Sequence, residues 1–100
     1  MVAIASLVLT LICGVAFAES ATDIFKVRCS ACHGKDGSGD TMIGRNLKIR
    51  SLASDEVQKQ SDEELFTIIH KGKNRMPAFD QKLTPEEIRE VVKFVRSLKK

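Results

Sequence analysis

The sequence predicts an all-α domain. Residues 84–98 carry Ile88, Val91, Val92 and Val95 at helical spacing, with charged residues between them. Ser or Thr stands just before several apolar stretches, where helix N-caps are expected. No strand-like alternation, internal repeat or Pro/Gly-rich linker interrupts this pattern. A chain of 100 residues has room for one such domain.

The first helix is expected from Ala21 to Cys32, with Ser20 as its N-cap. The glycine-rich segment 34–40 then predicts a chain reversal, because it lacks the strand, helix and Gly-Lys-Ser/Thr pattern of a phosphate loop. Residues 41–50 are expected to be irregular, with a turn at residues 44–47.

Three further elements are expected in the second half of the chain. Ser54 predicts the cap of a short helix within residues 51–60, and residues 61–64 form a capping-box pattern that opens a helix ending near His70. Gly72 is expected to stop that helix, followed by an extended loop that ends in a turn at Asp80. Thr84, with proline next and Glu three residues later, begins the final helix.

The N-terminal 18 residues differ from the rest of the chain. They carry no charge, so all 16 Lys+Arg and 13 Asp+Glu lie beyond them. Residues 16–18 read Ala-Phe-Ala, a small-residue cleavage pattern, which predicts a signal peptide at 1–18 and a mature domain at 19–100. A basic start is missing from residues 1–6, so an uncleaved anchor stays open as the alternative.

The motif Cys29-Ser30-Ala31-Cys32-His33 fits the haem-attachment pattern C-x-x-C-H. Residues three apart on a helical turn share one face, so both thiols can reach the two vinyl groups of one porphyrin. His33 then follows at once and can bind the iron. The motif therefore predicts one covalent haem c, with Cys29 and Cys32 as tethers and His33 as a metal ligand.

Two other uses of a cysteine pair fit this sequence less well. A redox disulfide of the thioredoxin type needs a βαβ pattern, which the sequence lacks. A structural zinc site needs four ligands, and Cys29, Cys32, His33 and the distant His70 would be an unusual set. The third cysteine, Cys13, would leave with the signal peptide.

The second axial ligand has three candidates: Met42, Met76 and His70. Met76 precedes Pro77, which favours an extended backbone, and it lies in a loop able to cover the haem face opposite His33. His70 is expected at a helix C-terminus, where a cationic imidazole is favourable. Met42 and its neighbour Ile43 are expected to pack toward the haem edge. Met76 is therefore the predicted ligand.

The expected core is thin, since the mature chain has no Trp and no Tyr. A domain this small needs a stabilising element beyond its own side chains, and a covalently bound haem supplies large apolar faces at the centre of the core. We therefore expect the haem-free chain to be largely unfolded.

With these motifs, residues 20–100 resemble a small class I monohaem cytochrome c of the short bacterial or photosynthetic type. The resemblance implies three to four helices wrapped around one covalent haem. It also implies that the N-terminal and C-terminal helices cross, with Phe25 and Phe94 as their aromatic residues. Ala21 stands where the family usually has glycine at that crossing.

The resemblance also departs from the family pattern after the glycine-rich loop. The family usually has Gly-Pro-x-Leu, and the proline carbonyl accepts the Nδ1–H of the proximal histidine. Here the run is Gly44-Arg45-Asn46-Leu47, so the Arg45 carbonyl is the expected acceptor for His33. Without Trp or Tyr to bind the haem propionates, Arg45, Asn46, Lys48 and Arg50 stay open as candidates.

The resemblance implies a soluble electron-transfer protein that is not an enzyme and is exported to the bacterial periplasm, with the thylakoid lumen or a membrane-anchored form as alternatives. Alternatives are a haem-c electron-entry subunit of a larger dehydrogenase or oxidase, and a haem enzyme or sensor with a labile Met76. A monomer that meets redox proteins, but no nucleic acid or small-molecule substrate, is expected. A cationic cluster flanks the motifs and would suit acidic docking surfaces: Lys26, Lys35, Lys71, Lys73 and Arg75.

Overall fold

The structure, a computed structural model, describes residues 3, 5 and 20–100. Apart from residues 3 and 5, the predicted signal peptide and its cleavage site lie outside the described residues. Within the described part of the chain, no helix is both long and apolar enough to cross a membrane.

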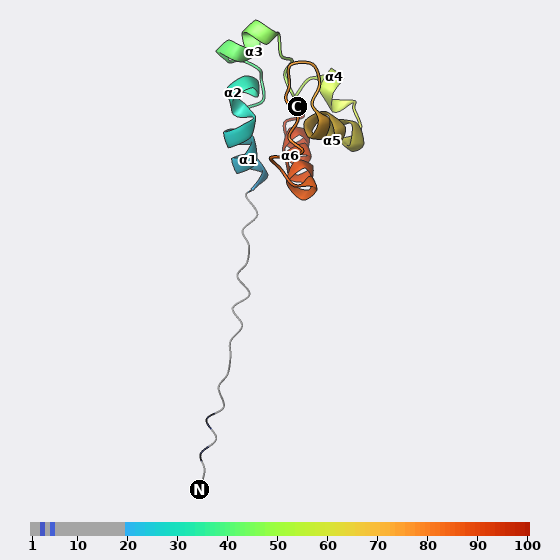
Figure 1. The fold of residues 1–100 in the computed structure, drawn as a ribbon. Helices are drawn as coiled ribbons and strands as arrows, with labels where there is room; N and C mark the ends of the chain where they lie inside the picture. Colours follow the sequence, from blue (N-terminus) through green and yellow to red (C-terminus); the bar gives the residue numbers. More distant parts are fainter. Residues whose placement is uncertain (1–2, 4, 6–19) are drawn as a thin grey trace.

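The described residues form helices and no strand, as the sequence predicts. Their order is α1 (Ala21–Arg28), α2 (Ser30–His33), α3 (Met42–Leu47), α4 (Asp55–Gln58), α5 (Asp62–Lys71) and α6 (Pro85–Ser97). Figure 1 shows α1, α2 and α3 following one another along one side, with α4, α5 and α6 on the other. The functional motif and the loop after α5 therefore face each other from two halves of the domain.

Helix α6 joins these two halves. It contacts both α1 and α5, and its buried residues follow the apolar stripe predicted from the sequence: Ile88, Val91, Val92 and Val95. Phe25 of α1 is almost fully buried, and its ring packs on that of Phe94 with centroids 4.4 Å apart. The predicted crossing of the first and last helices is thus present, with Ala21 half-buried at the start of α1.

The predicted helix starts are present as local hydrogen bonds. The Thr84 hydroxyl accepts the N–H of Glu87, while the Glu87 carboxylate accepts the N–H of Thr84. The Ser54 hydroxyl caps α4 by accepting the N–H of Val57. The Ser61 hydroxyl caps α5 in the same way, by accepting the N–H of Glu64. Gly72 ends α5 with a φ of 77°, a conformation that glycine adopts without a Cβ penalty.

Two predicted segments differ in the structure. The single helix expected from Ala21 to Cys32 is wrong: α1 ends at Arg28, and Cys29 (φ −119°) separates it from α2. The turn expected at residues 44–47 is instead part of α3, which Thr41 caps by accepting the Gly44 N–H. The two segments contact each other at the attachment motif, as described below.

The short helix α4 is held by side-chain hydrogen bonds. The Arg96 guanidinium donates to the Gln58 carbonyl at 2.8 Å, to the Gln60 carbonyl, and to Asp62 Oδ1 at 2.8 Å. In return, the Gln58 amide donates to the carbonyls of Leu52 and Val95 at 2.8 and 2.9 Å. Two long polar side chains thereby fasten residues 52–62 to the C-terminal half of α6.

Candidate haem site

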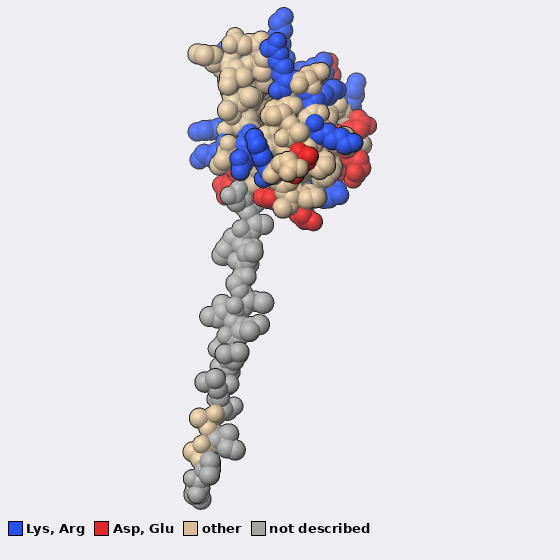
Figure 2. Space-filling view, in the orientation of Figure 1, with Lys and Arg blue, Asp and Glu red and all other residues tan. Residues whose placement is uncertain are grey.

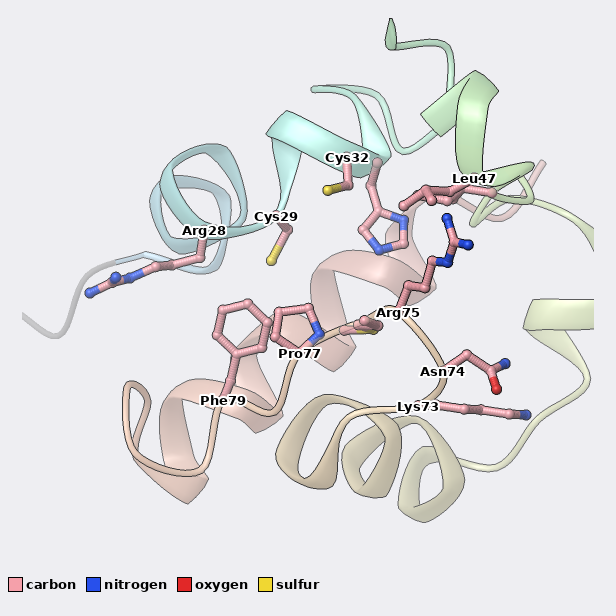
Figure 3. Close-up of a pocket in the computed structure, with 12 residues that line it drawn as sticks. Arg28, Cys29, Cys32, Leu47, Lys73, Asn74, Arg75, Pro77 and Phe79 are labelled. Carbon is pink, nitrogen blue, oxygen red and sulfur yellow. The ribbon is translucent and has the colours of Figure 1, made fainter. Parts of the chain in front are cut away.

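A cavity of about 420 Å³ opens between the attachment motif and the loop after α5. It has the size of ordinary cofactor and ligand sites. Figure 3 shows Cys29, Cys32 and Leu47 on one wall and Arg75, Pro77 and Phe79 on the other, with the side chains of Lys73 and Asn74 extending to the right, away from the cysteines. The remaining lining residues are Arg28, His33, Ile49 and Met76. All four predicted site residues, Cys29, Cys32, His33 and Met76, therefore line one cavity.

The attachment motif is held in a tight, kinked turn. The Cys29 carbonyl accepts both the Cys32 N–H at 3.3 Å and the His33 N–H at 3.0 Å, so the two cysteines and the histidine belong to one turn. Gly34 then ends α2 with a φ of 81°. Because α1 stops at Cys29, the motif leaves the direction of the first helix and both sulfur atoms reach the cavity.

Helix α3 packs directly beneath this turn. The Thr41 hydroxyl donates to the Cys32 carbonyl at 2.8 Å while it caps α3 through Gly44. A Cβ on Gly44 would lie 2.7 Å from the Cys32 carbonyl oxygen and 2.2 Å from that of Gly39. Gly44 is therefore required for the close approach, and Leu47 and Ile49 beyond it line the cavity.

The loop that carries Met76 is closed by its own backbone. Lys73 and Met76 exchange hydrogen bonds between their N–H and carbonyl groups at 2.9 and 3.1 Å, around Asn74 with a φ of 54°. A Cβ on Gly72 would lie 2.7 Å from the Met76 carbonyl oxygen, so only glycine lets the loop fold back this closely. Met76 is half-buried against the core. Met76 thereby lines the cavity from the loop opposite α2.

His33 has one ring nitrogen with no partner. Its Nδ1 is buried and has no hydrogen bond within the described residues. The expected bond to the Arg45 carbonyl is absent, because α3 turns that carbonyl toward the Lys48 N–H at 3.3 Å. Burial also lowers the pKa of His33, which favours the neutral imidazole with a lone pair free to bind a metal.

Burial has the opposite effect on the first cysteine. It raises the pKa of the Cys29 thiol to about 11, and Cys32 adds to the rise while Arg28 opposes it. The thiol is thus protonated near neutral pH, unlike the low-pKa thiolates of redox-active cysteine pairs. Within residues 20–100, no three His, Cys, Asp or Glu side chains are placed so that together they could hold a metal ion, so the zinc alternative has no ligand set there.

Two of the other candidates lie away from the cavity lining. Met42 and Ile43 are exposed (75% and 46%) and neither lines the cavity, so the expectation that they pack toward the haem edge is wrong. His70 stacks on Phe66 with ring centroids 5.5 Å apart. Sequence reasoning missed the apolar lining residues Leu47, Ile49 and Phe79, although the Gly-x-x-Leu and Met-Pro-x-Phe patterns contain two of them.

The lining suits a haem group. Two thiols, an imidazole and a thioether are the donor types that tether and ligate haem c, and apolar side chains of Leu47, Ile49, Pro77 and Phe79 complete the walls. Because Nδ1 is the buried nitrogen of His33, Nε2 is the ring nitrogen left to bind a metal. Chemistry and shape therefore agree with the prediction from the C-x-x-C-H motif.

Residues 16–95 match the protein family described as "Cytochrome C oxidase, cbb3-type, subunit III". Cytochrome c6 of Gracilaria tenuistipitata var. liui is 34% identical over 77 residues, which span 77% of this chain and 68% of the relative. The chain belongs to the cytochrome c family. Among solved structures, the c-type cytochrome KustC0563 superposes with a TM-score of 0.75 and 38% identity, over 81% of this chain and 99% of that one.

Cytochrome c6 of the diatom Phaeodactylum tricornutum gives a TM-score of 0.58 at 30% identity, over 77% of this chain and 88% of its own. These similarities confirm the predicted all-α cytochrome c fold of a small monohaem class I cytochrome. As a cytochrome c, the protein carries one covalently bound haem c and functions in electron transfer.

Proposed function

We propose that this cytochrome is an exported single-electron carrier with Cys29 and Cys32 as haem tethers and His33 and Met76 as axial ligands. The observation that carries the proposal is the cavity that these four side chains share. His33 comes from the turn after α1, and Met76 comes from the closed loop after α5. An imidazole and a thioether from separate halves of the domain suit the two faces of one porphyrin.

When bound, the haem supplies an iron that alternates between the Fe(II) and Fe(III) states. The protein's part is to hold both ligands through that change. His33 is fixed by the backbone of its turn, and Met76 by the hydrogen bonds between residues 73 and 76. Met76 is a neutral donor, which favours Fe(II) and raises the reduction potential, and the apolar lining excludes water. A cytochrome with both axial positions filled has no place for a substrate, so the proposed protein is not an enzyme.

The electron would leave at the cavity mouth, where cations gather. Arg28, Lys73 and Arg75 line the cavity. On the face that Figure 2 draws, acidic groups gather at the right edge and base of the folded part. An acidic redox partner would therefore be guided toward the mouth. Brief contact through a small interface suits an electron carrier, which we propose acts as a monomer.

Export follows from the expected signal peptide at residues 1–18, with the bacterial periplasm as the proposed compartment and the thylakoid lumen or an N-terminal membrane anchor as alternatives. Mass spectrometry of the protein purified from its host tests this. A mature N-terminus at Glu19 supports cleavage, while an intact residue 1 supports the anchor.

A second candidate is an electron-entry subunit of a larger oxidase. The observation in its favour is the family description, which names a subunit of a cbb3-type oxidase. Native electrophoresis of gently solubilised host membranes, stained for haem, separates the two candidates. A free carrier migrates as a small species of single-chain mass, whereas a subunit migrates with a larger complex.

The ligand assignment is tested by replacing Met76. In Met76→Ala, haem stays attached on denaturing electrophoresis, the reduction potential falls, and the reduced protein binds carbon monoxide rapidly. The matched control is Met42→Ala, since Met42 is exposed on α3. Unchanged spectra and potential in Met76→Ala would refute the assignment, and rapid carbon monoxide binding by the unmodified protein would favour the enzyme or sensor alternative with a labile Met76.

A further inference from the structure

We infer that Asn74 and Arg75 bind the haem propionates, while Arg28, the other arginine of the cavity, takes no part in this contact. The inference rests on the proposed tethering by Cys29 and Cys32. The cations that line the cavity would then differ in role: Arg75 binds a propionate, whereas Arg28 does not.

The argument starts from the asymmetry of the haem itself. Its two vinyl groups and its two propionates leave opposite edges of the porphyrin. Cysteines that react with the vinyl groups therefore fix which end of the cavity receives the carboxylates. In this cavity that end is the one farthest from the sulfur of Cys29.

The two arginines lie at opposite ends of the cavity. Figure 3 shows Arg28 beyond Cys29 at one end, and Arg75 with Asn74 at the other, on the far side of Cys32. All of these residues line the same cavity. Arg28 thus sits at the tether end, and Asn74 and Arg75 occupy the end expected for the propionates.

The side chains named from the sequence as propionate partners are poorly suited. Arg45 pairs with Asp40 at 2.5 Å, and Arg50 pairs with Glu56 at 2.9 Å. The lining of the cavity includes neither of them, nor Asn46 or Lys48. By contrast, Arg75 has no ion pair or side-chain hydrogen bond with any other described residue, so its guanidinium is available.

The chemistry of the two residues also fits. A guanidinium binds a carboxylate through two parallel N–H groups, and a side-chain amide adds a further donor. The turn between Lys73 and Met76 holds both residues at fixed positions next to the proposed iron ligand. A propionate beside Arg75 would stay ionised, because a nearby cation lowers the pKa of a carboxyl group by about 1 to 3 pH units.

The test compares Arg75→Gln with Arg28→Gln, which remove equal charge from opposite ends of the cavity. In the oxidised holoprotein, proton NMR of the haem methyl groups follows propionate ionisation as the pH changes. Arg75→Gln should raise the propionate pKa by about 1 to 3 pH units, and Arg75→Lys should restore part of the shift. Arg28→Gln should leave the titration unchanged. An unchanged titration in Arg75→Gln, or an equal shift in both glutamine variants, overturns the inference.

Asn74→Gly provides a second variant, since glycine keeps the left-handed backbone at φ 54° while it removes the amide. It should give a smaller upward shift of the same propionate pKa, and no shift would remove Asn74 from the contact. Peptide mass spectrometry of the same samples reports haem attached to Cys29 and Cys32. If the attachment is found there and the titrations do not shift, only this inference fails; if it is absent, the proposed tethers fail.

Discussion

The rings of Phe25 and Phe94 pack with their centroids 4.4 Å apart and an interplanar angle of 33°, which ties α1 to α6. Phe25 is 2% exposed, and its ring also lies 6.3 Å from that of His33. The contact thus connects the crossing of the terminal helices to the haem-attachment turn. A loss of packing at this crossing should therefore also disturb the position of His33, the proposed iron ligand.

Phe25→Ala should lower the free energy of unfolding of the holoprotein by about 3 to 5 kcal/mol, because it leaves a large cavity in the core. Guanidinium denaturation followed by circular dichroism measures the loss. Phe94→Ala should cost less, since Phe94 is only half-buried. In a double-mutant cycle, the two residues should couple by about 0.5 to 1.5 kcal/mol. Additive costs would show that the rings do not interact.

The Arg96 side chain should contribute more to the free energy of unfolding than an ordinary surface charge does. Arg96→Met leaves the carbonyls of Gln58 and Gln60 without their donor, and should lower the free energy of unfolding by about 1.5 to 3 kcal/mol. Lys93→Met is the matched control on the same helix. The lysine of its ion pair with Glu90 is 73% exposed, and the loss of that pair should cost under about 1 kcal/mol. Equal effects in the two variants would contradict the role given to Arg96.

Local sequence signals predicted much of this fold. The caps at Ser54, Ser61 and Thr84, and the stop at Gly72, depend on neighbouring residues alone, and the structure shows each of them. The apolar stripe of α6 likewise appeared as a buried face. The four residues predicted for the haem site line one cavity, because a short motif specifies three of them and a Met-Pro pair marks the fourth.

The errors lie where distant contacts override local pattern. At the break itself the Ser30 hydroxyl donates to the Lys26 carbonyl. The turn that follows is held by Thr41, nine residues beyond the Cys32 carbonyl that it binds, and by the close approach of Gly44, and no pattern near Cys29 reports these contacts. For the same reason residues 42–47 form a helix, and Met42 points to solvent. The propionate end of the cavity could not be read from the sequence either, since it depends on which side chains the fold brings opposite Cys29.

The positive cavity mouth should make electron transfer depend on salt. The rate of oxidation by ferricyanide, an anion, should fall as ionic strength rises, while oxidation by a cationic cobalt complex should rise or stay level. Arg28→Gln should reduce the salt dependence with ferricyanide. Lys93→Gln removes the same charge outside the cavity lining and should change it less. If the rate of oxidation by ferricyanide does not change with ionic strength, the cations at the cavity mouth do not guide charged partners.

Removal of the haem should unfold most of the domain. The haem-free chain lacks the apolar faces that fill the cavity between its two halves, so its circular dichroism should show little helix compared with the holoprotein. Expression without haem attachment, confirmed by the absence of visible absorption, provides the sample. Helix content close to that of the holoprotein would contradict this prediction.

The residual folded fraction of the haem-free chain should be greatest between about pH 6.5 and pH 9. Burial lowers the pKa of His33 below its ordinary value of 6.5, so the unfolded chain protonates His33 more readily than the folded chain. The folded form therefore loses stability as the pH falls below 6.5. The pKa of Cys29 rises from 9.0 to about 11, so ionisation favours the unfolded chain as the pH rises above 9. The helix content of the haem-free chain, measured in a stabilising osmolyte, should therefore fall below about pH 6.5 and above about pH 9. Cys29→Ala should flatten the alkaline side alone, and an unchanged alkaline fall would assign it to another group.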